Sequence, residues 1–371
     1  MTPTLFFIAY VLAFGLQTYL IKRLFIDDIK LKNKRYLSRS LYILFAISLL
    51  YPLARYFPLV PNWLYFLLSL PIGVLFLTFG IAIVHKLVSF GCKRLKLNQK
   101  RRDFFRKTLD IGSTSLILAT NLKAVDNARH IELEVVDIEL KNLKKPYKLV
   151  QLSDVHIGGL IDREFIKNLV KKVNVLSADV VVITGDLVDT KLEFAKSAID
   201  ELSGLKSTYG TYFVVGNHEY FHGVSPIIEY LKSIDIRVLE NENIYIGADA
   251  EGFNLAGVYD LFGFRYAKFE PDINKALKGV KVNSPTLLLA HQPKYINFLH
   301  STEGIDLMLS GHTHGGQLWP FNFLVALEQP YVKGLHKHNE HTQVYVNKGT
   351  GFWGPPMRLG ASSEITLINL T

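Results

Sequence analysis

The chain has 371 residues, of which 49% are hydrophobic, and its formal net charge is +9. Residues 1–124 carry 18 Lys and Arg against 4 Asp and Glu, whereas residues 125–371 carry 24 against 29. The net acidic C-terminal part lacks the basic domain of nucleic-acid-binding proteins, so no nucleic acid is expected as a partner, and the single Cys92 excludes an intrachain disulfide and a cysteine-based zinc site.

Three apolar segments near the N-terminus, residues 4–21, 41–57 and 63–84, are long enough to cross a bilayer as helices. The alternative is a buried helical bundle, but the flanking charges favour a membrane. Residues 22–39 contain seven basic residues and residues 86–107 contain nine, whereas residues 51–62 contain one. The positive-inside rule then places the N-terminus outside and both basic segments in the cytoplasm. We therefore expect a multi-pass protein of the cell membrane.

A fourth candidate span, residues 109–122, is ambiguous because its apolar part, Ile111–Leu122, is short and contains Ser, Thr and Asn. The preceding "KRRDFFRK" (100–107) resembles the twin-arginine export signature, with Phe105 and Arg106 in place of Leu and Lys. The alternative is a basic cytoplasmic flank. If residues 109–122 cross the membrane, the rest of the chain lies outside the cytoplasm, which is the side we expect; otherwise it lies on the cytoplasmic face.

From about residue 125 to residue 371, strand and helix patterns alternate, which predicts an α/β domain. Strands are expected at 131–140, 147–154, 178–186, 236–239, 244–246, 253–258, 342–349 and 364–370. Strands that run into loops are expected at 210–219, 286–293 and 305–314. Helices are expected at 163–176, 192–205, 226–233, 271–278 and 293–300.

Polar side chains follow five of these strands at the point where each ends. They are Asp154, His156, Asp186, Asn217, His218, His291, His312 and His314. Open α/β sheets place their sites beyond the carboxyl ends of the strands. Singly, each of these residues is compatible with an ordinary cap or turn. Together, their oxygen and nitrogen donors suit Mn, Fe or Zn better than Mg or Ca, and they are too many for one tetrahedral zinc. The set predicts two divalent metal ions bridged by a carboxylate.

The motifs "LSDVHIG", "VVITGDLVD", "VVGNHEY" and "GHTHGGQ", in this order, resemble those of the calcineurin-like metallophosphoesterases. Together with "YVNKGTGFWGPPMRLG" they look most like the membrane-associated or exported bacterial branch. The resemblance covers roughly residues 147–370. It implies a four-layer αββα sandwich, which here would follow an all-α transmembrane bundle (residues 1–124).

The resemblance also implies roles for the strand-end residues. The first metal would be held by Asp154, His156 and His314, the second by Asn217, His291 and His312, and Asp186 would bridge both. His218 would be no ligand, but would stabilise or protonate the leaving-group oxygen. The implied reaction is hydrolysis of a phosphoester or pyrophosphate bond by a metal-activated hydroxide, and the membrane anchor suggests a lipid-linked substrate. No protein partner can be inferred.

Two alternatives remain open. One is a lipid enzyme similar to the UDP-2,3-diacylglucosamine pyrophosphatases, which would act at the cytosolic face. The other is a non-catalytic metal-dependent membrane scaffold. Scaffolds of this kind usually lack ligands or the catalytic histidine, whereas this sequence contains all of them.

Several further residues are weaker candidates. His222 and His300 match no ligand of the family, and "HKHNEH" (336–341) is interpreted as a solvated loop rather than a metal site. A salt bridge is favoured over phosphate binding for Arg358. Gly315 and Gly316 are expected to let the loop pass close to the metals. For Trp319, Phe321 and Phe323 a lipid entrance, a membrane contact and ordinary packing stay open.

Overall fold

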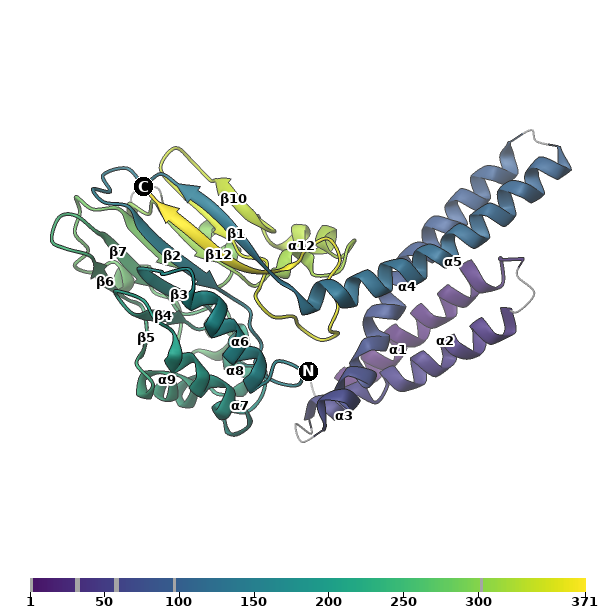
Figure 1. The fold of residues 1–371 in the computed structure, drawn as a ribbon, viewed down its shortest axis with the longest axis horizontal. Coiled ribbons are helices and arrows are strands. Elements are labelled where there is room, and N and C mark those ends of the chain that lie inside the picture. Colours follow the sequence, from purple (N-terminus) through teal and green to yellow (C-terminus); the bar gives the residue numbers. More distant parts are fainter. Residues whose placement is uncertain (1–2, 31–33, 57–59, 96–97, 301–302) are drawn as a thin grey trace. The chain divides into compact units, whose positions relative to one another are not determined.

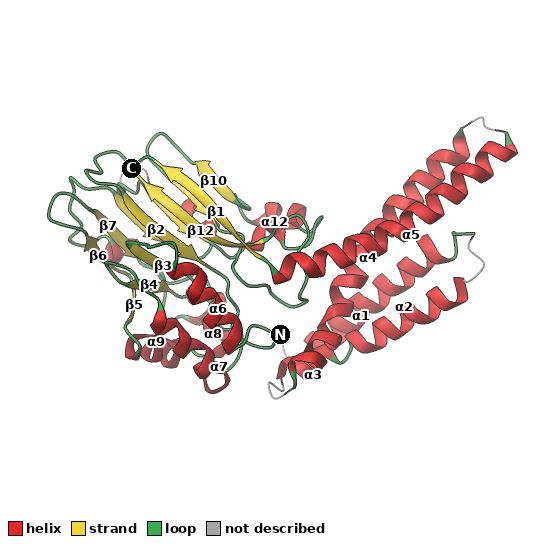
Figure 2. Ribbon diagram, viewed as in Figure 1, coloured by secondary structure: helices red, strands yellow, loops and turns green. Residues whose placement is uncertain are grey.

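The computed structural model describes residues 3–30, 34–56, 60–95, 98–300 and 303–371. The chain forms two units (Figures 1 and 2). A helical unit contains the chain up to Arg129 together with the short segment Gly354–Leu359, and an α/β unit contains His130–Trp353 and Gly360–Thr371. The boundary expected after residue 124 lies inside the last helix of the helical unit.

The helical unit consists of α1 (Pro3–Ile21), the π-helical turn η1 (Lys22–Ile26), α2 (Lys34–Ser48), α3 (Tyr51–Tyr56), α4 (Asn62–Arg94) and α5 (Gln99–Arg129). Among the described residues, three helical stretches are long and apolar enough to cross a membrane: Thr4–Ile26, Lys34–Arg55 and Asn62–Arg94. They overlap the three expected segments, although residue 57 of the second lies outside the described residues. Helix α5, which contains residues 109–122, is not among them.

Helix α5 nevertheless accompanies α4 along its length and runs in the opposite direction (Figure 1). Near one end of the pair, His85 Nε2 lies 3.0 Å from Asp110 Oδ1, and near the other the Arg129 guanidinium lies 5.9 Å from the Phe66 ring centroid. His85 and Asp110 are both buried, whereas apolar side chains such as Leu118 point outward. Polar groups inside and apolar groups outside are typical of a helix that faces lipid.

The α/β unit contains two six-stranded sheets. The first has the order β1-β12-β2-β3-β4-β5, formed by Ile131–Ile138, Ser363–Leu370, Tyr147–Leu152, Val180–Thr184, Thr211–Val214 and Ile236–Val238. The second has the order β10-β11-β9-β8-β7-β6, formed by Gly334–Lys337, Gln343–Val346, Leu307–Ser310, Thr286–Leu289, Phe253–Gly257 and Glu242–Ile246. The central strands β2 to β5 are parallel to one another, as are β7, β8, β9 and β11.

Strand β3 shows why the sheets stack. Its sequence is apolar at successive positions, which is typical of a strand buried on both faces. Val181 and Ile183 belong to the core shared with helices α6 (Arg163–Asn174), α7 (Leu192–Ile199) and α9 (Val224–Ser233). Val180 and Val182 belong to a second core, which contains residues of both sheets. A third core packs the far face of the second sheet against α11 (Ile273–Ala276) and the 3₁₀ turn η3 (Pro293–Phe298). These are the four layers of the expected αββα sandwich.

Short elements differ from the expectations. The helix expected at 271–278 is reduced to α11, and the one at 293–300 is the 3₁₀ turn η3. Residues after β4, expected as a loop, form α8 (Asn217–His222), because the Glu219 carboxylate accepts the Gly216 N–H and so caps the first turn. Helices α10 (Gly263–Tyr266) and α12 (Asn322–Glu328) and strand β10 were not expected, and β10 includes the first two residues of the presumed loop 336–341.

Candidate active site

The carboxyl ends of five strands, from both sheets, carry the expected residues. Asp154 and His156 follow β2, Asp186 follows β3, and Asn217 and His218 begin α8 after β4; His291 follows β8, and His312 and His314 follow β9. Several hydrogen bonds join the sheets here. The Gln151 amide donates to the Ser310 carbonyl (2.9 Å), and the His312 N–H donates to the Asp154 carboxylate (2.9 Å).

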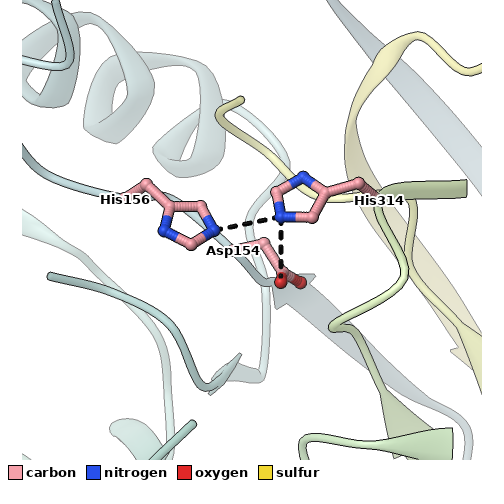
Figure 3. Close-up of side chains that lie close together, drawn as sticks. All are labelled: Asp154, His156 and His314. Carbon is pink, nitrogen blue, oxygen red and sulfur yellow. Dashed lines mark hydrogen bonds and ion pairs between the residues drawn. The ribbon is translucent and has the colours of Figure 1, made fainter. Parts of the chain in front are cut away.

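The first group of possible ligands contains Asp154, His156 and His314 (Figure 3). His314 Nε2 lies 3.4 Å from Asp154 Oδ1 and 3.0 Å from His156 Nε2. The His314 side chain is 11% exposed and the other two side chains are almost fully buried, so the three donor atoms lie largely inside the protein.

The second group contains Asp186, His291 and His312, joined by Asn217. His291 Nε2 lies 3.2 Å from Asp186 Oδ2, 3.2 Å from Asn217 Oδ1 and 3.3 Å from His312 Nδ1. Asp186 Oδ2 also lies 3.9 Å from His156 Nε2, a member of the first group. The structure thus brings the seven expected ligands together in two groups, with Asp186 between them.

The backbone is strained at these positions. Five of the seven residues have positive φ: 50° at Asp154, 55° at His156, 50° at Asp186, 68° at His312 and 50° at His314. This region is uncommon for residues other than glycine and costs of order 1–3 kcal/mol each, so it persists only where surrounding contacts hold it. Here the Asp154 N–H donates to the Gly185 carbonyl (3.0 Å) and the His156 N–H to the Asp186 carbonyl (3.0 Å).

Two motif glycines make room for the carboxylates. A Cβ atom on Gly216 would collide with Asp186, and one on Gly311 would collide with Asp154 and Ser153. Any other residue at these two positions would displace a possible ligand. The glycines therefore belong to the site through close backbone approach rather than through chain flexibility.

The donor chemistry fits divalent cations. Imidazole nitrogens and carboxylate oxygens converge in each group, and buried charges of this kind require a partner. Burial raises the pKa of Asp154 to about 6. Burial acts in the same direction on Asp186, but the imidazoles of His291, His218 and His156 together outweigh it and hold the pKa of Asp186 well below its usual range. Two divalent cations, one on each side of Asp186, would give the carboxylates and imidazoles of both groups the partner that buried groups of this kind require.

His218 lies beside the groups and is oriented by a residue that the sequence analysis did not single out. Its Nδ1 lies 2.7 Å from Asp189 Oδ1, and its Nε2 is turned toward Asp186 Oδ2 at 3.8 Å. Asp189 is the last residue of the "VVITGDLVD" motif, which was the available signal. His222 also reaches Asp189, with Nε2 at 3.5 Å.

Glu219, which lies in the "VVGNHEY" motif but was given no role from the sequence, supports the site through backbone hydrogen bonds. Its carboxylate accepts the backbone N–H groups of Asp186 (3.1 Å), Val188 (3.0 Å) and Gly216 (2.7 Å), and it is fully buried. Burial and the neighbouring Asp186 charge raise the pKa of Glu219 to about 7, against the effect of these donors. Glu219 thereby fixes two of the strand ends relative to each other.

The weaker candidates lie elsewhere. His336 stacks on Tyr331 at 4.5 Å, and His338 Nδ1 lies 3.0 Å from the Tyr331 hydroxyl, so both belong to a local polar cluster. Arg358 is fully buried in the helical unit, where its N–H donates to the Ala124 carbonyl. Gly315 and Gly316 both have positive φ.

Ordinary packing does not account for the aromatic residues that follow the last motif. Trp319, Phe321 and Phe323 are 52%, 45% and 62% exposed, and α12 has no buried residue. The lipid and membrane interpretations of these side chains stay open.

Comparison with known proteins gives one family. The family model for calcineurin-like phosphoesterase matches residues 147–316. An uncharacterized metallophosphoesterase of Helicobacter pylori (strain J99) is 39% identical over 367 residues, which is 98% of this chain and 97% of the relative. A transmembrane protein with metallophosphoesterase domain from Bos taurus is 37% identical over 306 residues, 78% of this chain and 68% of the relative.

Among solved structures, a dimetal phosphatase from Danio rerio is 13% identical and covers 55% of this chain and 87% of its own, with a TM-score of 0.36. The match to the Helicobacter pylori relative extends over the helical unit as well as the α/β unit, and the bovine relative is itself a transmembrane protein. The chain therefore belongs to the calcineurin-like metallophosphoesterase family and is a membrane-associated phosphoester hydrolase.

Proposed function

We propose that Asp154, His156 and His314 hold one divalent cation, that Asn217, His291 and His312 hold a second, and that Asp186 bridges the two. The observation that carries this proposal is the position of Asp186, whose Oδ2 lies 3.2 Å from His291 Nε2 and 3.9 Å from His156 Nε2. Mn, Fe and Zn suit this donor set, and manganese is the first metal to test.

The cations would supply Lewis-acid stabilisation of the phosphoryl oxygens and a water of lowered pKa as the nucleophile. Hydrolysis would form a bond from the oxygen of that water to phosphorus and break the bond from phosphorus to the leaving-group oxygen; the water would release one proton to solvent and the leaving oxygen would gain one. His218 Nε2 is turned toward Asp186 and donates a proton to the departing oxygen. Asp189 accepts the Nδ1–H of His218, which keeps the other ring nitrogen directed at the substrate.

The substrate is proposed to be a phosphoester with a membrane lipid as one part. The exposed aromatic and aliphatic side chains of Trp319, Phe321 and α12 support this, because an exposed apolar surface can contact a lipid, whereas a soluble polar substrate would not require one. A UDP-diacylglucosamine-type pyrophosphate is the alternative, and it requires the α/β unit to face the cytosol. A non-catalytic scaffold is less well supported, since His218 and every ligand are in place.

We propose four membrane crossings, with α5 as the last, and an α/β unit outside the cytoplasm. The support is the antiparallel course of α4 and α5. Helix α5 contacts α4 both near His85 and near Phe66, so if α4 crosses the bilayer between these residues, α5 crosses it beside α4. The polar Asp110 would be tolerated because it meets His85 inside the bundle.

One pair of measurements tests the proposed chemistry. The full-length protein, loaded with manganese, should hydrolyse at least one member of a set of phosphomonoesters, phosphodiesters and pyrophosphates. His218→Ala should keep the metal content while turnover falls. If the metal-loaded protein hydrolysed no member of the set, the proposed hydrolase chemistry would be rejected. If His218→Ala had the same turnover as the parent, the role of His218 would be rejected.

A topology experiment tests the membrane arrangement. A reporter that is active on only one side of the membrane, fused after Thr371, should report an extracytoplasmic C-terminus. A cytoplasmic result would instead mean that α5 does not cross, and would make the UDP-diacylglucosamine-type substrate the better hypothesis.

A further inference from the structure

A band of aromatic rings begins at the catalytic histidine. The His218 ring meets the Phe221 ring at 5.4 Å and the Trp353 ring at 6.0 Å between centroids, both edge to face. Phe221 in turn contacts Phe262 at 5.0 Å, and Phe262 contacts Tyr266 at 5.6 Å. The band is therefore continuous with the active site rather than a separate surface.

These rings are exposed although they lie beside a polar centre. Phe221 is 53% exposed, Trp353 is 49% exposed and Tyr266 is 53% exposed. Single exposed aromatic residues are ordinary, but a connected set beside a catalytic group is typical of a surface that receives a ligand. Around His218 the site therefore offers the apolar rings of Phe221 and Trp353 in addition to the polar Asp189.

Trp353 is held in place by the metal-ligand loop. The Gln317 amide nitrogen donates to the Trp353 carbonyl (2.9 Å), and the Trp353 N–H donates to the Gln317 side-chain oxygen (2.9 Å). Gln317 is buried and lies three residues after His314. The backbone of Trp353 is thus fixed relative to this loop, and its ring lies edge to face with the His218 ring, where a specificity-determining side chain needs to be.

We infer that Phe221 and Trp353 select a substrate whose leaving group is a bulky apolar alcohol. This inference rests on the proposed function, in which His218 protonates the departing oxygen. The group attached to that oxygen must lie against whatever surrounds His218, and Phe221 and Trp353 are the exposed side chains that touch its ring. A long-chain alkyl group would cover both of them, and the membrane-spanning helices of the same chain place the enzyme where such alcohols occur.

The test uses n-alkyl esters, from butyl to dodecyl, of whichever phosphoester class the manganese-loaded full-length protein hydrolyses. Their leaving alcohols have nearly equal acidity, so only the apolar length changes. Each buried methylene is worth a factor of up to about four, so kcat/KM should rise with chain length. Phe221→Ala and Trp353→Ala should flatten this rise, lowering kcat/KM for the dodecyl ester about tenfold and for the butyl ester by less than about threefold.

Controls separate this effect from misfolding. Phe221→Leu and Trp353→Phe keep an apolar side chain and should restore most of the chain-length dependence. Phe194→Ala removes an exposed ring on α7 that is not one of the rings of the band, and should leave the dependence unchanged. The metal content of every variant should equal that of the parent.

The outcomes are distinct. The inference would be overturned if kcat/KM of the parent did not depend on chain length, or if the alanine variants kept that dependence. The proposed hydrolase function would remain in either case. A preference for nucleoside esters over alkyl esters of the same class would overturn the inference of an alkyl leaving group, and would indicate that Phe221 and Trp353 stack on a base instead. No hydrolysis of any ester would instead refute the proposed function itself.

Discussion

Replacing Asp189 by Asn tests whether His218 depends on its orienting carboxylate. The contact between Asp189 Oδ1 and His218 Nδ1 is 2.7 Å long, and the two side chains are only 11% and 9% exposed, so water screens it little. A hydrogen bond to a charged group contributes about 1.5–3 kcal/mol. If all of that acts in the transition state, turnover should fall roughly 10–150-fold, because each 1.36 kcal/mol is a factor of ten.

The assay is steady-state hydrolysis by manganese-loaded protein, with metal content measured on the same sample. Asp189→Asn should lower kcat and leave both cations bound, since Asp189 is not one of the seven proposed ligands, although it lies close enough to His156 and His218 to form a third group of possible ligands with them. His222→Gln is the matched control: it removes a second imidazole from the same carboxylate, and its effect should be small.

A double-mutant cycle decides whether Asp189 acts through His218. If it does, Asp189→Asn should slow the wild-type enzyme but hardly slow the His218→Ala enzyme, because neighbours that act as one unit are not additive. Equal slowing in both backgrounds, or loss of metal from Asp189→Asn, would refute the reasoning.

Three further results are expected. Asp186→Asn should weaken binding of both cations, by more than the roughly 10–100-fold typical of residues that only support ligands, and titration of the metal-free protein would show it; loss of one cation alone would contradict a bridge. Burial raises the pKa of Asp154 to about 6, so protons compete with a cation for this carboxylate as the pH falls; the affinity of the metal-free protein for manganese should therefore weaken between about pH 7.5 and about pH 5, and an Asp154→Asn variant that binds manganese as tightly as the parent at about pH 7.5 would argue against Asp154 as a ligand. Glu219→Gln turns an amide N–H₂ toward backbone donors at a cost of about 1–3 kcal/mol, which should lower the melting temperature by about 3–10 °C; an unchanged melting temperature would remove its structural role.

Much of the α/β unit could be predicted from the sequence because its signals are local. The run "VVVIT" and its neighbours have the length and composition of buried strands, and parallel strands present their carboxyl ends at one edge. That reasoning places Asp154, Asp186 and Asn217 together on the first sheet. It does not bring His291 and His312 to the same point, since these follow strands of the second sheet. The family resemblance supplied that step, and packing of the two sheets provides its physical cause.

The residues that the sequence analysis missed act over long separations or through the backbone. Asp189 and His218 meet because β3 and β4 are neighbours, and an aspartate three residues after a ligand gives no local sign of its partner. Glu219 was given no role from the sequence because the donors to its carboxylate are backbone N–H groups, which no side-chain pattern reveals. The short helix α12 lacks the length over which a helical period becomes visible.

The strained backbone at the proposed ligands and the ring contacts of His218 together explain how this site could select its substrate. Five of the seven proposed ligands have positive φ, and backbone hydrogen bonds between neighbouring strand ends hold Asp154 and His156 in that conformation. The donor atoms are therefore positioned by the fold, and binding energy from the substrate is not needed to assemble them. Under the proposed function, substrate binding energy can instead come from the rings beside His218, where the backbone of Trp353 is joined through Gln317 to the same loop as His314. A site arranged in this way discriminates by the leaving group, since the phosphoryl side is common to every phosphoester.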